Sequence, residues 1–489
     1  MMTGSTSEID VQLQTRLFID GEFVDAADGS TFEVENPARG EPLAEVAEAK
    51  AADIDRAVAA ARRAFDSAEW QGMPARGRGL LHARLADAVE TEIDELARIE
   101  TLDNGKPYFE SRQIDLPEVV AVLRYYAGWA DKIQGETIPV AGPFLNYTRR
   151  EPLGVVGAIV PWNFPLLLAV WKLAPALACG NTVVLKPAEE TPLSALKLAE
   201  LARRVGFPAG VLNVIPGFGP GAGAALVRHA DVDAIAFTGS TEVGREIMRE
   251  AATTLKHVSL ELGGKSPNIV FADADLEAAV RGVAIGIFYG KGEVCAAGSR
   301  LFVDATIHEE FVEKLAERSR KVTTGDPFDK KTRLGALVSK RQMERVLGYV
   351  EKGRSEGAEL VAGGARVDRP GYYVEASVFD KVTPEMTIAQ EEIFGPVLAT
   401  LSFDDVDEAI ELANRTIYGL AAGIWTRDLR TAHRVAHGVR AGTVWVNTYN
   451  RYDPAAPFGG YKQSGFGRDL GAHALEKYTQ VKDIWIDLS

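Results

Sequence analysis

Apolar positions follow a helical period in the first third of the chain and alternate between strand and helix patterns after it. Between residues 52 and 103 apolar residues recur three and four positions apart, which predicts a series of amphipathic helices, and another helix is predicted over 113–132. Ahead of them, residues 16–37 predict a hairpin and a further strand, with turns at Asp20–Gly21 and Asp28–Gly29. The segment 133–151 loses the helical period and predicts extended strands.

From Pro152 onward, short apolar strand patterns alternate with helical ones. Predicted strands cover 154–160, 181–186, 210–215, 234–239 and 257–262, and predicted helices follow PWNFP at 161–165 and cover 193–206, 222–229 and 242–252. This alternation predicts an α/β fold with a doubly wound parallel sheet, whose ligands bind at the carboxyl ends of the strands. A second α/β block is predicted over 266–465, with a helix at 307–322 and strands at 396–403 and 441–447.

The length of 489 residues exceeds what one hydrophobic core usually organises, which predicts two or three domains. We expect residues 15–132 and 152–265 to form one of them and 266–465 another. The last segment, 476–489, alternates like a strand and is expected to pair with 133–151. Residues 1–14 are small and polar, and we expect them to form a disordered tail.

Composition and charge restrict the classes of protein to which the chain can belong. It is 46% hydrophobic and 25% charged, which is ordinary for a globular protein with a large core. A net charge of −15 argues against nucleic-acid binding, which calls for a basic surface. The N-terminus lacks the pattern of a signal peptide, and the longest apolar stretch, 166–178, contains Lys172 and Pro175 and is too short for a membrane span.

Two cysteines, Cys179 and Cys295, are too few for a disulfide framework, and no Cys/His spacing predicts a zinc site or another metal site. A reducing cytoplasm fits this usage best. Cys179 follows an apolar helix pattern and is interpreted as buried and structural.

The stretch Val258–Arg300 carries the strongest candidate chemistry. Glu261 ends an apolar strand pattern just before Gly263–Gly264, and Cys295 lies among small or apolar neighbours. A thiol with a base in reach and little local bulk is the arrangement that covalent catalysis requires. A lone cysteine is nevertheless more often buried and inert, so Cys295 needs support from elsewhere in the chain.

Two strand ends predict a nucleotide site. In AIAFTGSTEVG, Gly239 and Gly244 span a strand-to-helix junction whose backbone N–H groups suit a diphosphate, with Ser240 available as the helix cap. In VLKPAEETP, Lys186 and Glu189 follow another strand, and a carboxylate there can bind ribose hydroxyls and repel a 2′-phosphate. Taken singly, these features are better explained by an ordinary turn and by two solvated charges on a loop.

Together these segments resemble the NAD(P)-dependent aldehyde dehydrogenase family over nearly the whole chain. The resemblance rests on PWNFPLLLAVWKLAPALACGNTVVLKPAEETP, FTGSTEVG, LELGGKSPNIV, GEVCAAGSR, QEEIFGPV and PFGGYKQSGFGR, in the family's order and spacing. It implies the aldehyde dehydrogenase fold, with a Rossmann-like NAD-binding domain (15–132 and 152–265), an α/β catalytic domain (266–465) and a small β oligomerisation sheet (133–151 and 476–489). A homodimer or homotetramer is then expected.

The resemblance also implies roles for single residues. Cys295 is similar to the family's nucleophile, Glu261 to its general base and Asn163 to its oxyanion-stabilising amide, while Lys172 is similar to a lysine of a proton relay. The residues implied in cofactor binding are Trp162, Lys186, Glu189, Gly219, Phe237, Gly239, Ser240, Gly244, Leu262, Glu392 and Phe394. NAD is the expected cofactor, and Glu189 disfavours NADP.

Three residues depart from the family pattern. Lys291 stands where many relatives have an uncharged polar residue, and Glu293 is acidic beside the nucleophile. Both charges either alter the reactivity of Cys295 or face away from it. Asp469 stands where many relatives have glutamate thought to act with the lysine that matches Lys172, which puts the relay in doubt.

The expected substrate is a small-molecule aldehyde, and the residues expected to line its pocket are Phe164, Leu168, Trp171, Tyr289, Tyr452 and Phe458. Such apolar, aromatic walls suit a hydrophobic aliphatic or aromatic aldehyde, although ordinary core packing would also explain them. A betaine-aldehyde-type substrate stays open because aromatic rings bind quaternary ammonium groups, and Arg451 could meet an acidic semialdehyde. A coenzyme A-acylating variant, and a relative turned structural or binding protein, are the remaining alternatives.

Overall fold

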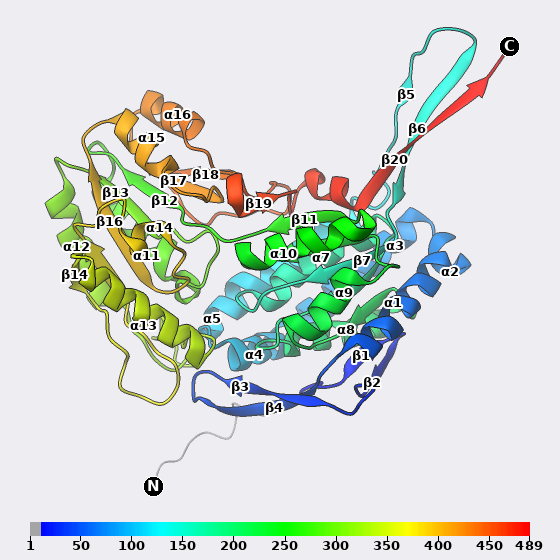
Figure 1. Cartoon of the computed structure of the whole chain (residues 1–489), viewed down its shortest axis with the longest axis horizontal. Coiled ribbons are helices and arrows are strands. Elements are labelled where there is room, and N and C mark those ends of the chain that lie inside the picture. Colours follow the sequence, from blue (N-terminus) through cyan, green and yellow to red (C-terminus); the bar gives the residue numbers. More distant parts are fainter. Residues whose placement is uncertain (1–10) are drawn as a thin grey trace.

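The computed structural model describes residues 11–489 (Figure 1). Its first part is a hairpin, a two-stranded sheet and a helical layer, as predicted. The elements are β1 (Leu17–Ile19), β2 (Glu22–Val24), β3 (Thr31–Asn36), β4 (Glu41–Ala47), α1 (Ala51–Asp66), α2 (Ala68–Gln71), α3 (Ala75–Thr91), α4 (Ile93–Asn104), α5 (Tyr108–Glu110), the π-helix η1 (Ser111–Asp115) and α6 (Leu116–Ala127).

The predicted strand-helix alternation after Pro152 forms an eight-stranded sheet in the order β19-β11-β10-β7-β8-β9-β1-β2. Its elements are β7 (Val155–Ile159), α7 (Pro165–Ala178), β8 (Thr182–Lys186), α8 (Leu193–Val205), β9 (Leu212–Val214), η2 (Gly219–Gly223), α9 (Ala224–Arg228), β10 (Ala234–Thr238), α10 (Thr241–Ala251), η3 (Ala252–Thr254), β11 (His257–Glu261) and β19 (Gly465–Phe466). The five strands from β7 to β11 are parallel. Since the chain moves outward from β7 on one side and restarts at β10 on the other, the topological switch point lies between these two strands.

A seven-stranded sheet in the order β14-β15-β16-β13-β12-β17-β18 forms the second α/β block. Its elements are β12 (Pro267–Val270), α11 (Leu276–Phe288), η4 (Tyr289–Gly292), β13 (Arg300–Asp304), α12 (His308–Arg320), α13 (Lys340–Ser355), β14 (Glu359–Ala362), β15 (Ser377–Asp380), α14 (Thr387–Gln390), β16 (Val397–Phe403), α15 (Val406–Asn414), β17 (Ala421–Trp425), α16 (Leu429–Gly438), β18 (Thr443–Val446) and η5 (Lys462–Ser464). The two blocks lie on opposite sides of Figure 1, with the long connections of the chain between them.

A third sheet, β20-β6-β5, projects from the rest of the chain at the upper right of Figure 1. It comprises β5 (Thr137–Ile138), β6 (Phe144–Pro152) and β20 (Thr479–Asp487), the last preceded by η6 (Ala472–Tyr478). The predicted pairing of the C-terminal segment with the 133–151 segment is confirmed, since β20 runs antiparallel to β6 from Thr479↔Pro152 to Asp487↔Phe144. The oligomerisation role of this sheet and the domain boundaries stay predictions.

Helix α7 is the centre of the main core. All of its residues are buried, which is the pattern of a helix covered on every side. It therefore holds Lys172 inside the protein, and it carries Leu168 and Trp171 beside it.

The structure corrects one expectation at the N-terminus. Of the expected disordered tail 1–14, residues 1–10 lie outside the described part, whereas Val11 and Leu13 pack against the largest hydrophobic cluster. Within residues 11–489, no helix has the length and apolar character needed to cross a membrane.

Candidate active site

Cys295 lies at the end of a tight turn between α11 and β13. Gly290, Lys291 and Gly292 take left-handed conformations in succession, with φ of 56°, 64° and 71°. The turn brings the thiol to the wall of a cavity of about 610 Å³. Cys295 is partly exposed, whereas Cys179 is buried as predicted.

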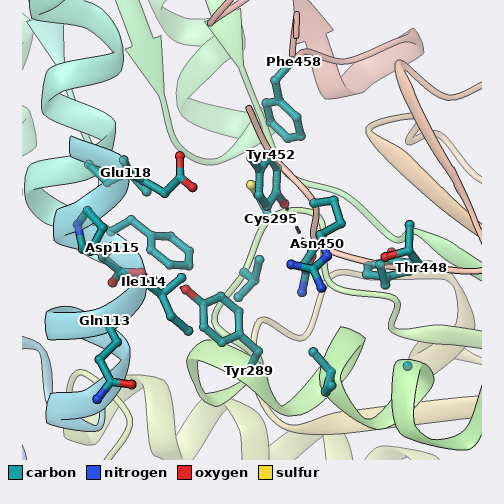
Figure 2. A pocket seen from close by; sticks show the side chains of 18 of the residues that line it. Gln113, Ile114, Asp115, Glu118, Tyr289, Cys295, Thr448, Asn450, Tyr452 and Phe458 are labelled. Atoms are coloured by element: carbon teal, nitrogen blue, oxygen red, sulfur yellow. Dashed lines mark hydrogen bonds between the residues drawn. The ribbon is translucent and has the colours of Figure 1, made fainter. Parts of the chain in front are cut away.

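All six residues that we expected around the substrate line this cavity, which Figure 2 shows. Trp171, Tyr452 and Phe458 pack against one another with ring centroids 5.5 to 6.0 Å apart. Phe164 and Tyr289 stack on each other at 6.0 Å. Glu118 and Asp115 come from the α6 side of the cavity, and Arg281 and Arg451 also line it, so the walls are apolar and the remaining lining carries both signs of charge.

A buried ion pair fixes the Phe164 and Tyr289 wall. Lys106 Nζ lies 2.6 Å from Asp115 Oδ2 and 4.3 Å from the centroid of the Phe164 ring. The Tyr289 hydroxyl donates to Asp115 Oδ1 at 2.8 Å. The two rings are thus held in place from behind.

Asn163 lies in the loop between β7 and α7, and its side chain is buried. Its Nδ2 donates to the backbone oxygen of Glu293 at 2.9 Å. An amide NH₂ group has two hydrogens, so a second donor remains for a ligand beside Cys295. Asn163 is therefore tied directly to the segment that carries the thiol.

Glu261 is the last residue of β11 and is buried. Neither carboxylate oxygen has a hydrogen-bond partner within residues 11–489. Glu261 and Cys295 both line a void of about 10 Å³, which is about the space that one water molecule occupies. Burial, with the nearby Asp469 carboxylate, holds the pKa of Glu261 well above its usual range.

Ionisation of Cys295 is disfavoured by its surroundings. Burial raises the pKa of its thiol to about 12, and the carboxylates of Glu392 and Glu261 act in the same direction. The thiol is therefore protonated near neutral pH, and a base must accept its proton before the sulfur can act as a nucleophile.

The structure brings Lys172 and Asp469 together despite the shorter side chain of aspartate. Lys172 Nζ lies 3.1 Å from Asp469 Oδ2, and Lys477 pairs with the other oxygen. Burial lowers the pKa of Lys172, although Asp469 opposes this. A charged chain thus leads from the neighbourhood of Glu261 to Lys477, whose side chain is 10% exposed.

The residues expected to bind the cofactor surround the carboxyl edge of the first sheet. Lys186 ends β8 and pairs with Glu189 at 2.9 Å. Ser240 follows β10 and caps α10 by accepting from the Val243 N–H at 3.3 Å. Gly219 opens η2 after β9.

Close packing explains the two glycines of this edge. A Cβ on Gly239 would lie 2.4 Å from the ring of Phe237, and one on Gly244 would lie 2.7 Å from the Leu262 side chain. Both clashes are closer than real Cβ contacts allow. The strand end and the first turn of α10 therefore approach each other only because these positions carry no side chain.

Glu392 and Phe394 reach the same edge from the second block. Glu392 Oε1 accepts from the Gly264 N–H at 2.9 Å, and the Phe394 ring lies edge-on to Trp162 with centroids 5.2 Å apart. Burial raises the pKa of Glu392 to about 7. Glu392 is thus held beside the Gly263–Gly264 turn that follows Glu261.

Sequence reasoning missed a set of buried charges beneath the site. Glu100, Asp103, Asn104 and Lys106 are buried, although the helical pattern that contains them predicts only a core-forming helix. The signal was present for Glu100 and Asp103, because in α4 they fall on the face that its apolar residues also use, whereas Lys106 lies beyond the end of that helix. A charge on the apolar face of a predicted helix is a reason to expect a buried network.

Comparisons with known proteins agree with this geometry. A family model described as "Aldehyde dehydrogenase family" matches residues 23–484. An aldehyde dehydrogenase of Enchytraeus buchholzi is 54% identical over 96% of this chain and 95% of its own. The chain is also similar to an aldehyde dehydrogenase from Bacillus cereus whose structure was solved as an NAD⁺ complex. The two sequences are 52% identical, and the structures match over 100% of both chains with a TM-score of 0.97. A P. syringae indole-3-acetaldehyde dehydrogenase, solved with NAD⁺ and IAA, is 49% identical over 98% of both chains, with a TM-score of 0.97.

Proposed function

The chain belongs to the aldehyde dehydrogenase family and is an NAD-dependent aldehyde dehydrogenase, and we propose that it works through a covalent adduct on Cys295. The overall reaction converts an aldehyde, NAD⁺ and water to a carboxylic acid, NADH and a proton. The main support for this proposal is the position of Cys295. It lines both the large aromatic cavity and the small void that Glu261 also lines.

The first step assigns three groups of the chain. The sulfur of Cys295 attacks the aldehyde carbon while its proton passes to a base, for which Glu261 is the candidate in the shared void. The new oxyanion accepts hydrogen bonds from the free hydrogen of Asn163 Nδ2 and from the Cys295 N–H. Removal of one such donor typically lowers kcat by about 10²- to 10³-fold.

The second half of the reaction uses Glu261. After loss of hydride the acyl group is joined to Cys295 as a thioester, and the thiol proton held by Glu261 leaves for solvent. Glu261 then takes a proton from a water molecule that attacks the thioester carbon. Cleavage of the C–S bond releases the carboxylic acid, and the cysteine sulfur leaves as a thiolate that takes up this proton. Burial and the nearby Asp469 carboxylate raise the pKa of Glu261, which makes its carboxylate a stronger proton acceptor than an ordinary glutamate. The proton that Glu261 takes from the thiol can reach the surface through the ion-paired chain of Lys172, Asp469 and Lys477.

The carboxyl edge of the first sheet fits NAD. It has a switch point between β7 and β10, a capped helix N-terminus at Ser240, two closely packed glycines at the strand-to-helix junction, and the Lys186–Glu189 pair. We assign the diphosphate to the Ser240 turn, the adenosine ribose to Lys186 and Glu189, and the nicotinamide end to Glu392, Phe394 and Trp162. NAD, when bound there, supplies the hydride acceptor of the reaction.

For the substrate, the aromatic walls support a hydrophobic aliphatic or aromatic aldehyde. Five of the six residues expected there are aromatic, they line a cavity of about 610 Å³, and the relative from P. syringae is named for an indole aldehyde. A panel of aldehydes of increasing size, assayed by the absorbance of reduced nicotinamide, should show kcat/KM rising with apolar surface. A preference for charged semialdehydes, or a coenzyme A thioester as product when coenzyme A is present, would contradict this assignment.

We also propose that the chain assembles as a homodimer or homotetramer through its third sheet. The side chains of Ile138, Phe144, Val481 and Trp485 on this sheet are 38 to 59% exposed. Such a concentration of apolar surface on a projecting sheet is typical of an interface.

The direct test of the nucleophile is Cys295→Ala. This variant should lose aldehyde oxidation and retain the wild-type affinity for NAD, measured by quenching of tryptophan fluorescence, because no cofactor contact is removed. Cys179→Ala is the matched control and should keep its activity. Oxidation near the wild-type rate in Cys295→Ala would contradict the proposal.

A further inference from the structure

Lys291 and Glu293 form a buried ion pair directly ahead of the nucleophile. Their side chains are 1% and 0% exposed, and Lys291 Nζ lies 2.7 Å from Glu293 Oε2. Lys291 also takes a left-handed backbone conformation that favours glycine, between two glycines that take the same one. A strained residue of this kind persists where its side chain is held by its surroundings, and such residues cluster at active sites.

The ammonium group of Lys291 joins the nucleophile segment to the end of α4. In addition to its ion pair with Glu293, it donates to the backbone oxygen of Asn104 at 2.7 Å and to Asn104 Oδ1 at 2.9 Å. Asn104 Nδ2 in turn donates to the backbone oxygen of Trp162 at 2.7 Å. The next residue, Asn163, donates from its side chain back to the Glu293 oxygen at 2.9 Å.

These contacts form a closed circuit, which we call the Lys291 bridge: Lys291, Asn104, Trp162, Asn163 and Glu293. It connects the loop that carries the Asn163 amide to the loop that carries the Cys295 thiol. Trp162 and Asn163 take part from the first loop, and Lys291 and Glu293 from the second. Glu293 is anchored further, because its Oε1 accepts from the Val338 N–H at 3.1 Å. Asn163 and Trp162 already have proposed roles in the site, whereas Lys291, Glu293 and Asn104 have none.

We propose that Lys291 and Glu293 are positioning residues that fix the amide of Asn163 relative to Cys295. The inference rests on the proposed oxyanion role of Asn163. It answers the question raised by the sequence, since the two charged groups contact each other, Asn104 and the Val338 N–H, and so act on the site through the neighbouring loop.

A purely stabilising role and direct electrostatic control of the thiol are both less consistent with the contacts. A buried ion pair is weak evidence of stability, because apolar residues of the same volume usually stabilise as well or better. Direct control of the thiol does not fit either, since the groups that raise the pKa of Cys295 most, after burial, are Glu392 and Glu261. Two opposite charges 2.7 Å apart largely cancel at a distance.

The test is a double-mutant cycle between Lys291→Gln and Asn163→Ala, measured as the pre-steady-state rate of reduced nicotinamide formation. We expect Lys291→Gln alone to lower this rate by roughly 10- to 10²-fold, since a small misplacement of a catalytic group can have an effect of that size. In the Asn163→Ala background the same change should lower the rate by less than about 2-fold, because the group that it positions is already absent. Effects that multiply would overturn the proposal.

Two further readouts separate positioning from general damage. The affinity for NAD, and the rate at which iodoacetamide alkylates Cys295, should stay within about 2-fold of wild type in Lys291→Gln, because the positioning role concerns the amide only. A larger change in alkylation would assign the pair to the thiol and overturn the proposal. If Lys291→Gln does not fold, Asn104→Ala breaks the same circuit and takes its place in the cycle.

Lys197→Met is the matched control. Lys197 is 9% exposed and pairs with Glu92 and Glu95 between α4 and α8, away from Asn163. Its replacement should lower the melting temperature without slowing the pre-steady-state rate. A wild-type rate in Asn163→Ala alone would reject the proposed oxyanion role itself, whereas a slow Asn163→Ala with multiplying effects rejects only the positioning role.

Discussion

At the scale of single residues, the site combines a thiol that resists ionisation with carboxylates that resist it as well. Burial raises the pKa of Cys295 to about 12 and holds that of Glu261 well above its usual range. Neither group therefore releases its proton to water as readily as an ordinary thiol or carboxyl group does. In the cofactor-free enzyme this arrangement keeps the cysteine protonated and unreactive near neutral pH.

The first prediction concerns the pH dependence of Cys295. Its alkylation by iodoacetamide should keep rising above pH of about 8.5, where an ordinary thiol is half ionised, because only the thiolate reacts. Glu392→Gln removes the carboxylate that raises this pKa most after burial, so the alkylation profile should shift to lower pH. The control is Glu391→Gln, an exposed neighbour that should leave the profile unchanged. A wild-type profile that levels off near pH of about 8.5 would contradict this account.

The second prediction concerns the choice of cofactor. Glu189 accepts from Lys186 at 2.9 Å and is placed to repel a 2′-phosphate. Glu189→Gln should raise kcat/KM with NADP relative to NAD by at least about 10-fold, since it removes one like-charge contact. An unchanged ratio in steady-state assays with both cofactors would remove Glu189 from the specificity of the site.

At the scale of elements, tight packing of α10 on the end of β11 holds the N-terminus of this helix at the carboxyl edge of the first sheet. The Cβ-free surface of Gly244 faces the Leu262 side chain, and a Cβ there would lie only 2.7 Å from it. The N-terminus of α10, with its Ser240 cap, is thereby held next to the residues that follow Glu261. The contact between Gly244 of α10 and Leu262 therefore lies directly after the proposed base, Glu261.

The third prediction tests that contact. Gly244→Ala should push the first turn of α10 away from Leu262 and weaken NAD binding by roughly 10-fold or more, because close approach of the backbone is lost. Alkylation of Cys295 should be unaffected. Gly348→Ala in α13 is the matched control, since a Cβ there meets no atom within 4 Å. Wild-type NAD affinity in Gly244→Ala, by fluorescence titration, would show that this packing does not position the helix.

The elements of the first sheet were predictable from the sequence because their residues obey local rules. The runs that form β7, β8 and β10 are largely apolar and buried along their whole length, as parallel strands covered on both faces are. The positions of Lys186, Glu189 and Ser240 at the sheet edge were predictable for the same reason, since these residues end or follow strands.

The buried charges could not be placed in this way. Asn104, Lys106 and Asp115 meet Trp162, Phe164 and Tyr289 only through tertiary packing. The direction of Lys291 and Glu293 was open for the same reason, because a left-handed turn decides which way their side chains point. Local pattern contains no information about partners so far away in the chain.

At the scale of the whole molecule, the third sheet is where the chain exposes most apolar surface on a projecting element. Phe144 and Trp485 lie edge-to-face across β6 and β20 with centroids 5.9 Å apart. An exposed sheet of this composition would be a liability in a monomer. It is consistent with the proposed oligomer.

The fourth prediction follows from this surface. Trp485→Asp should lower the mass of the assembly measured by light scattering, because a charge replaces an anchor of the interface that is 56% exposed in the single chain. Leu429→Asp, an equally drastic change at a residue of α16 that is 71% exposed, should leave the mass unchanged. A wild-type protein with the mass of one chain would contradict the proposed assembly.

The central claim is that Cys295 carries the acyl group and Glu261 releases it. The most direct measurement is mass spectrometry of Glu261→Gln after mixing with NAD and an aromatic aldehyde. We predict a burst of about one reduced nicotinamide per active site, slow turnover afterwards, and an acyl adduct on the peptide that contains Cys295. Full steady-state turnover with that peptide unmodified would contradict the account.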